Sequence, residues 1–330
     1  MKYKFFLLLT LCACSVGPDY SYKKFFEDDE IQKSIGLNKI ENDTEKYDFS
    51  LYDFNDQALN ILMDEVQENS STIKIAILKL KQARESLSIA FKNNLPLFDF
   101  TGKYNFLNEN KNAGNLMATD YYQTGIDMSW EIDIFGGGRR QTEASKAKYM
   151  AMLYNLKNVN VSLVSEVAMN YINLRNMEQQ LFNAKENLKM QEEAYELINN
   201  QYNVSLTDEI TLSQSKYLLE TTKMSIPKLE YQRNMYKNSL AILIGKLPED
   251  INDILGKANQ NIINQIFDLN LDNLYNLPVS VIRNRPDVKI AEENIIAQNA
   301  EIGVAISKLY PSVSLSSFFG FQSLKWSNLI

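Results

Sequence analysis

Histidine is absent from this sequence of 330 residues, and cysteine occurs only twice. Without histidine the chain cannot build a Ser-His-Asp or Cys-His nucleophile arrangement, or any histidine-based metal site. Acidic residues outnumber basic ones by 41 to 34, and the basic residues form no stripe, so we expect no nucleic-acid partner. Most carboxylates follow helical spacing, where a solvated face is the ordinary interpretation. We therefore expect no enzyme activity, no cofactor and no metal site.

Both cysteines lie in the N-terminal stretch "LTLCACSVGPDY", residues 9–20. Lys2 and Lys4 precede an apolar run, Phe5 to Leu11, that is too short to span a bilayer and is followed by small residues. This pattern is typical of a secretory signal. Leu11 stands three places before Cys14, and a small residue stands directly before Cys14, which is the bacterial lipoprotein pattern. The pattern predicts that Cys14 is acylated and forms the mature N-terminus.

The second cysteine, Cys12, would be removed with the signal, so the mature chain could form no internal disulfide. An ordinary signal peptide with two incidental cysteines remains the alternative. Ser15 follows Cys14 where inner-membrane lipoproteins typically carry aspartate, which favours the outer membrane.

Glycine is missing from the whole stretch between Arg139 and Ile244, where Pro227 is the only proline. Apolar residues recur there at alternating steps of three and four, a coiled-coil seam with Asn170 and Gln191 as polar interruptions that we expect to set register. The seam comprises Leu156, Val159, Leu163, Val167, Asn170, Leu174, Met177, Leu181, Ala184, Leu188, Gln191, Tyr195 and Ile198.

The seam breaks at "NVSLTDEI", residues 203–210, and then resumes. Asp208 and Glu209 stand at the expected start of a second helix, where the positive end of the helix dipole stabilises acidic side chains. These features predict a hairpin of two long helices, whose first arm of about 65 residues would reach roughly 95 Å. A lone hairpin of that length cannot bury its own surface, so it implies partners in the same assembly.

The period changes to two in "LFDFTGKYNF", residues 97–106, and in "YQTGIDMSWEIDIF", residues 122–135. Each segment is apolar and aromatic on one face and polar on the other, which indicates strands that face lipid outside and water inside. A half-buried soluble hairpin is the alternative, because it shows the same alternation. The predicted lipid-facing residues are Phe98, Phe100, Tyr104, Phe106, Ile126, Met128 and Trp130. The predicted lumen-facing residues are Asp99, Thr101, Lys103, Asn105, Asp127, Glu131 and Asp133. Carboxylates dominate the second set, so we expect an acidic interior that tolerates cations.

An internal repeat appears when the chain is shifted by 215 residues, which aligns 69–106 with 284–321 without a gap. The alternating strand after Pro96 then matches one after Pro311, with Val313, Leu315, Phe319 and Phe321 on its apolar face. Identical pairs are Asn69/Asn284, Lys74/Lys289, Ile75/Ile290, Ala76/Ala291, Ala90/Ala305, Pro96/Pro311 and Phe106/Phe321. The repeating unit is helix, proline, strand, loop, strand and long helical hairpin. The second unit stops after its first strand, so we expect a truncated or partial chain that does not close a duct alone.

Five segments of the sequence resemble those of the TolC-like outer membrane factors, lipoprotein branch. They are "CSVGPDY" at 14–20, "FNDQALNILMDEVQENSSTIKIA" at 54–76, "SWEIDIFGGGRRQTEASKA" at 129–147, "LAILIGKLP" at 240–248, and the stretch from 285 to 321 that begins "RPDVKIAEEN". The resemblance covers nearly the whole chain.

The resemblance implies a mainly α fold with a small β part. In that fold long antiparallel helical hairpins form an α-barrel tunnel, and strands from three protomers form one transmembrane β-barrel. It implies a homotrimer in the outer membrane, anchored by lipid at Cys14 and extending into the periplasm. Its function would be a passive duct for drugs or other small solutes, supplied by an inner-membrane pump through a periplasmic membrane-fusion adaptor. The tip that meets the adaptor would comprise Val204, Ser205, Leu206, Thr207, Asp208 and Glu209.

Two positions at this tip depart from the family pattern. Ser205 stands where glycine is usual and Thr211 where aspartate is common, which weakens the expectation of adaptor docking. The family's gate is lined largely by the second helical hairpin, so no gate residue can be assigned here. The run "GGGRR", residues 136–140, lacks the Lys-Ser/Thr ending of a phosphate-binding loop and is interpreted as the bend from strand to tunnel helix.

The pattern and the resemblance divide the chain into consecutive segments. We expect a lipoprotein signal peptide at 1–13, an N-terminal extension with the lipid anchor at 14–56, a first tunnel helix at 57–95, an outer-membrane β-hairpin at 96–135, a long periplasmic helical hairpin at 136–245, an equatorial connector at 246–277, the first tunnel helix of repeat two at 278–310 and its first, truncated strand at 311–330. The competing interpretation is a lipid-anchored periplasmic coiled-coil protein, structural or adaptor-like, that forms no pore.

Overall fold

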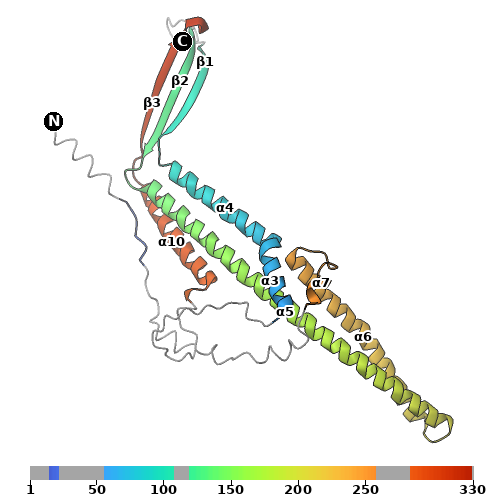
Figure 1. Cartoon of the computed structure of the whole chain (residues 1–330). Coiled ribbons are helices and arrows are strands. Elements are labelled where there is room, and N and C mark those ends of the chain that lie inside the picture. The colour runs from blue at the N-terminus through green and yellow to red at the C-terminus, as the bar shows by residue number, and fades with distance from the viewer. Residues whose placement is uncertain (1–14, 22–55, 108–118, 258–282, 329–330) are drawn as a thin grey trace, which may run out of the picture. The chain divides into compact units, whose positions relative to one another are not determined.

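The computed structural model describes residues 15–21, 56–107, 119–257 and 283–328 (Figure 1). Cys14, the predicted lipid anchor, lies outside the described residues. The fold is mainly helical with one small antiparallel sheet, as expected. It divides into two compact units, one containing the sheet and the helix ends next to it, the other containing the helical hairpin. The elements are α3 (Gln57–Asn69), α4 (Ser71–Lys92), β1 (Leu97–Leu107), β2 (Thr119–Ile132), α5 (Gly137–Asn203), α6 (Glu209–Ile244), α7 (Asn252–Leu255), α10 (Pro286–Ser307), β3 (Val313–Ser323) and the short 3-10 helix η4 (Trp326–Asn328).

The sheet has three strands in the order β1-β2-β3, all antiparallel. Strand β2 therefore lies between the first strands of the two sequence repeats. Phe100 lies opposite Ile126, and Ile126 lies opposite Phe319, so the apolar positions of all three strands share one face. Asp99 and Asp127 pair on the other face. Within the strands, pairing thus places the apolar positions and the acidic positions on opposite faces of the sheet.

Two aromatic residues, Tyr121 and Phe318, lie on the polar face. Phe318 lies opposite Asp127 on the polar face, where its ring covers the facing glycines Gly125 and Gly320. A Cβ added at Gly125 would lie 2.6 Å from the Gly320 Cα and 2.8 Å from the Phe318 ring. A side chain at Gly125 would therefore collide with both the Gly320 backbone and the Phe318 ring. The glycines leave room for the aromatic ring, which in turn covers the exposed backbone.

Replacing Gly125 with alanine is expected to displace the Phe318 ring and to lower the free energy of unfolding of the sheet by about 1–3 kcal/mol. Gly102→Ala is the matched control, because a Cβ at Gly102 of the neighbouring strand meets nothing within 4 Å. Urea unfolding of the purified protein, followed by tryptophan fluorescence, measures both. Equal losses for the two variants would contradict this packing.

Asn94 ties the end of α4 to the start of α5 at the foot of the sheet. Its side-chain Nδ2 donates to the Gly138 carbonyl at 3.3 Å and to Thr142 Oγ1 at 3.0 Å. Its backbone carbonyl accepts from Trp130 Nε1 at 3.0 Å. The bend predicted at 136–140 is present, since Gly136 has a positive φ of 80° and α5 begins at the next residue.

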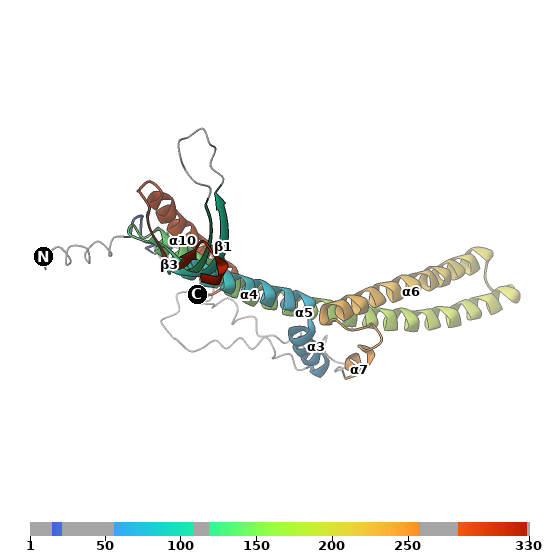
Figure 2. The ribbon, with the colours of Figure 1, turned by 90° about the horizontal axis from the view of Figure 1, so that it is seen from above.

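The two arms of the helical hairpin coincide with the stretch of sequence that lacks glycine. Helix α5 has 67 residues, and α6 has 36 residues and runs through Pro227. Figures 1 and 2 show α6 running back alongside α5 from the tip. Gln191 of the seam accepts a hydrogen bond from Thr222 Oγ1 of α6 at 2.8 Å, in agreement with a role in setting register. Helix α6 ends at Gly245, whose φ of 70° and backbone bonds to Ala241 and Ile242 form a glycine cap.

The core of the helical unit lies where α3 and α7 pack near the end of α6. Buried apolar residues from five helical segments and the turn before α7 form it: Ala58, Leu59, Leu62, Met63, Val66, Ile73, Leu163, Val164, Val167, Tyr171, Leu174, Leu240, Ala241, Ile244, Ile251 and Ile254. The expected single helix over 57–95 is interrupted. Ser70 is buried, has extended ψ of 128°, and caps α4 by accepting from the Thr72 N–H at 3.3 Å. No glycine or proline marks this break in the sequence.

Candidate functional site

The two faces of the sheet differ in chemistry. On the apolar face Phe100 and Phe319 are each 81% exposed, and Phe98, Tyr104, Ile126, Leu315 and Phe321 are exposed as well. Met128 and Trp130 are half-buried on the same face. Such a continuous aromatic surface is unusual for a soluble sheet and suits lipid. The orientation of Phe106, the remaining member of the predicted set, lies outside the described side chains.

The polar face carries a hydrogen-bonded acidic group at its centre. Asp127 accepts from Thr101 Oγ1 at 2.9 Å and forms an ion pair with Lys103 Nζ at 3.6 Å. Asp99 lies directly opposite Asp127, which brings two carboxylates side by side across the strands. Lys103 pairs with one of these two acids, and Glu131 adds a third carboxylate, which is exposed, to the face. The face is acidic, as the sequence predicted, and Asn105 lies half-buried on it.

Asp133 was expected on this face, but it lies beyond the end of β2 at Ile132. Its carboxylate accepts from the Arg139 backbone N–H at 2.9 Å and pairs with the Arg139 guanidinium at 3.4 Å. The strand prediction was wrong at this residue because the alternation continues in the sequence after the ladder has ended. A carboxylate beside the first turn of α5 is favoured by the free N–H groups there.

The tip between α5 and α6 explains the departure at Ser205. This serine has a positive φ of 61°, and the Leu206 N–H donates to the Gln201 carbonyl at 2.8 Å. Since left-handed backbone favours glycine, the usual glycine at this place has a conformational cause. Ser205 adopts the same conformation, so the turn is made without glycine. Of the other members of the predicted tip, Val204, Leu206 and Thr207 lie in the same turn, Asp208 is the N-cap of α6 and Glu209 is its first residue.

Asp208 caps α6, as its position predicted. Its Oδ1 accepts from the Thr211 N–H at 2.8 Å, and Glu209 follows in the first turn. Hydrogen bonds from the Thr211 side chain and backbone hold the pKa of Asp208 below its ordinary value of 3.8. Thr211, the second departure from the family pattern, thus serves the cap.

The cap gives a pH-dependent prediction. A depressed pKa means that the cap contributes fully above about pH 4 and is lost as the pH falls through the lowered pKa. Asp208→Ala should speed hydrogen exchange in the first turn of α6 at pH 7, and the difference from the parent should shrink near pH 2. Glu209→Ala is the control, because its carboxylate makes no cap hydrogen bond among the described contacts. A pH-independent difference would contradict the cap.

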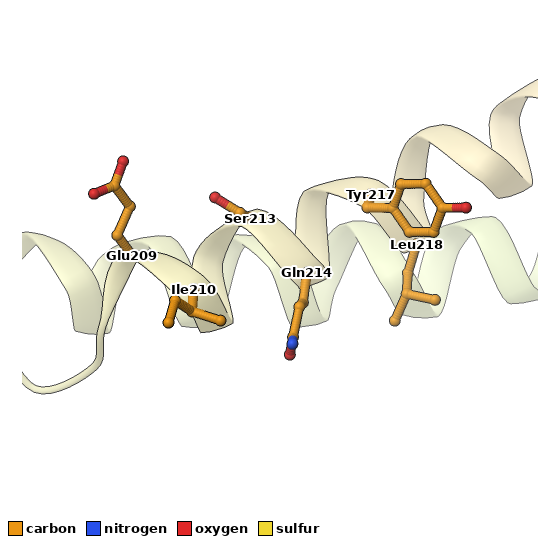
Figure 3. Close-up of a pocket in the computed structure, with 6 residues that line it drawn as sticks. All are labelled: Glu209, Ile210, Ser213, Gln214, Tyr217 and Leu218. Atoms are coloured by element: carbon orange, nitrogen blue, oxygen red, sulfur yellow. The ribbon is translucent and has the colours of Figure 1, made fainter.

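An apolar hollow continues from the tip along α6 (Figure 3). It is lined by Glu209, Ile210, Ser213, Gln214, Tyr217 and Leu218. Ile210 and Tyr217 are 68% and 71% exposed, so large apolar side chains face outward within two turns of the tip. The hollow offers apolar contact area but no cluster of titratable groups.

Sequence reasoning did not single out Arg140. Its side chain is buried, and its Nη2 lies 2.5 Å from Asp19 Oδ1, while its Nη1 lies 2.8 Å from Glu143 Oε2. These two carboxylates, Glu143 foremost, raise the pKa of Arg140. The sequence signal for it was present in "GGGRR" and "SVGPDY", but the two motifs are more than 115 residues apart.

The described residues lack two kinds of feature. Among these residues, no three acidic or cysteine side chains converge as metal ligands would. Within the same ranges, no helix combines the length and the apolar character that crossing a membrane requires.

The model of the family described as "Outer membrane efflux protein" matches residues 62–246. The cation efflux system protein CusC of Escherichia coli O6:H1 is 27% identical over 98% of this chain and 69% of its own length. The probable outer membrane lipoprotein SilC of Salmonella typhimurium is 27% identical over 84% of this chain and 58% of its own. The solved structure of the Campylobacter jejuni CmeC outer membrane channel is 25% identical, with a TM-score of 0.77 over 96% of this chain and 67% of CmeC.

The family match covers more than half of the chain and includes the helical hairpin with its tip. The structural likeness covers 96% of the chain. Both agree with the resemblance read from the sequence motifs. The chain therefore belongs to the outer membrane efflux protein family, whose place is the outer membrane.

Proposed function

We propose that the chain is a subunit of a passive duct in a tripartite export system, working as a homotrimer with a periplasmic adaptor and an inner-membrane pump. The observation that carries this proposal is the join between sheet and helix. β2, with its aromatic and acidic faces, ends at Ile132, and the 67-residue α5 begins at Gly137. A strand that suits lipid thus continues within five residues into a helix of about 100 Å.

The need for further subunits is supported by what the chain leaves uncovered. Strands β1 and β3 each have one edge without a strand partner among the described residues. Open strand edges are heavily penalised in lipid, so neighbouring protomers would supply the missing pairs. Large apolar side chains are also exposed along the hairpin: Met169, Phe182, Met190, Leu197, Tyr217, Met224 and Tyr231. Helices from the same assembly would cover them.

The tip is the proposed contact with the adaptor. Val204, Leu206 and Ile210 are 64%, 77% and 68% exposed, so three large apolar side chains at the tip face solvent. The hollow beside them extends the apolar surface along α6 (Figure 3). A helical adaptor hairpin would bury these side chains by coiled-coil packing.

The proposed cargo is a small solute, either a drug or an ion. CusC is named for cation efflux, and the acidic polar face of this chain is compatible with cations. A passive duct needs no catalytic group, because radius, lining charge and gate decide what passes.

The test is conductance of the protein expressed from its full reading frame, purified from outer membranes and added to planar lipid bilayers. A duct gives trimers on chemical cross-linking and discrete conductance steps. Phe100→Arg, which puts a charge on the aromatic face, should abolish insertion. Asn105→Arg places the same charge on the opposite face of the same strand and should leave insertion intact. A soluble protein without conductance once the lipid anchor is removed would favour the non-pore coiled-coil alternative.

A further inference from the structure

The mature N-terminal segment Ser15–Tyr20, here called the strap, lies across two helices that belong to different repeats. Its Val16 N–H donates to the Phe135 carbonyl at 3.0 Å, just before α5. Its Pro18 carbonyl accepts from Asn299 Nδ2 of α10 at 2.9 Å. The strap thus contacts residues about 160 positions apart in the sequence, at the foot of the sheet.

Arg140 of α5 binds most of the strap's acceptors. Its Nε donates to the Val16 carbonyl at 3.2 Å, and its Nη2 donates to the Gly17 carbonyl at 3.3 Å and to Asp19 Oδ1 at 2.5 Å. The Arg140 side chain is 6% exposed, whereas that of Asp19 is 90% exposed. A buried guanidinium is costly unless its donors are satisfied. Without the strap, Glu143 alone would remain among these partners, so strap and arginine stabilise each other.

Glycines on both sides make the close approach possible. Gly17 has a positive φ of 94°, and a Cβ added there would lie 2.5 Å from the Gly303 Cα of α10. A Cβ added at Gly303 would lie 2.8 Å from Arg140 Cγ and 3.0 Å from the Val16 carbonyl oxygen. Strap, Arg140 and α10 therefore meet with no space for a side chain between them. Lys148, about two turns after Arg140, forms a separate ion pair with Glu301 between α5 and α10.

We propose that the strap is a staple between the two repeats, in which Arg140 is the positioning residue that binds the strap and holds α5 against α10. The staple operates within the protomer, so it goes beyond the duct function and does not depend on pore formation. Its chemistry is a buried guanidinium shared between an in-helix carboxylate and the strap's carbonyl and carboxylate oxygens.

The experiment compares Arg140→Gln with Arg139→Gln in the purified, membrane-extracted protein. Arg139 is the matched control, because it is the neighbouring arginine of the same helix and its guanidinium bonds to Asp133 within the bend. Hydrogen exchange of the Val16 amide reports on strap binding. Nitroxide labels on cysteines at exposed Lys146 and Gln298 report the distance between α5 and α10.

Arg140→Gln should speed Val16 exchange by at least about tenfold and broaden the α5–α10 distance distribution, since it removes charge-assisted bonds. Arg139→Gln should change neither quantity. If Arg140→Gln does not accumulate, Asp19→Asn provides the test, because it leaves the guanidinium and Glu143 in place, and about threefold faster exchange is expected. Fast exchange with an unchanged helix distance would show a strap that only covers the helices and would overturn the staple. Unchanged exchange in both variants would overturn it as well.

Discussion

Replacing Asp56 with alanine is expected to lower the free energy of unfolding of the helical unit by about 2–4 kcal/mol. Asp56 is 1% exposed, and its two oxygens have separate tasks. Oδ1 caps α3 by accepting from the Leu59 N–H at 3.0 Å, and Oδ2 accepts from the Tyr171 hydroxyl at 3.0 Å. The variant leaves a buried N–H and a fully buried hydroxyl without these acceptors, which is why the loss exceeds that of an exposed cap.

The surroundings of Tyr171 make the loss difficult to repair. Burial raises the pKa of the Tyr171 hydroxyl, so it stays a donor throughout the physiological range. Arg175 lies over the ring with its guanidinium carbon 4.9 Å from the centroid, and donates to the Leu255 carbonyl at 2.9 Å. Asp56, Tyr171 and Arg175 thus connect α3, α5 and α7.

Urea unfolding followed by circular dichroism at 222 nm measures the effect. Asp64→Ala is the matched control, since Asp64 is an exposed aspartate on the same helix. Tyr171→Phe removes only the hydroxyl, and the double variant should cost less than the two single losses added together. An Asp56→Ala protein within about 0.5 kcal/mol of the parent would show that the buried bonds contribute little.

The long helices and the strand faces could be predicted because both are written in local periodicity. The glycine-free stretch from Arg139 predicted α5 to within two residues of its start at Gly137. The alternation around Phe98 and Asp127 predicted which side chains share a face, and pairing confirms it. The bend at 136–140 was predictable from a local signal of another kind, the run of three glycines. Glycine readily adopts the positive φ that Gly136 has.

The errors occur where a distant partner decides the structure. The break at Ser70 carries no glycine or proline, and depends on burial of Ser70 next to the core. Alternation from Val313 predicts the polar face for Phe318, but it does not predict that two glycines on neighbouring strands meet beneath the Phe318 ring. Arg140 was missed because its partners in the strap lie more than 120 positions away. Local patterns predict elements and faces, but not which side chains meet across the fold.

Neutralising the acidic face with Asp99→Asn, Asp127→Asn and Glu131→Gln together is expected to lower the cation-to-anion permeability ratio by at least about threefold. A unit charge about 10 Å away in water changes local ion concentration by roughly a factor of two, and three charges per protomer act together. Asp127 also accepts from Thr101 and pairs with Lys103, so the remaining lysine would make the face weakly positive. The parent channel should favour cations.

The ratio follows from the reversal potential in a KCl gradient, with the protein from its full reading frame in planar bilayers. The control variant neutralises three exposed carboxylates outside the strands, Glu249, Asp250 and Asp253, by the same isosteric changes. It should keep the parent ratio, because its charges are removed from the linker and α7 rather than from the sheet. Raising the salt from 0.1 M to 1 M should weaken the difference between parent and strand variant, since the Debye length falls from about 10 Å to about 3 Å. A parent channel that favours anions, or a strand variant with an unchanged ratio at low salt, would mean that the polar strand face does not set the charge of the conducting path.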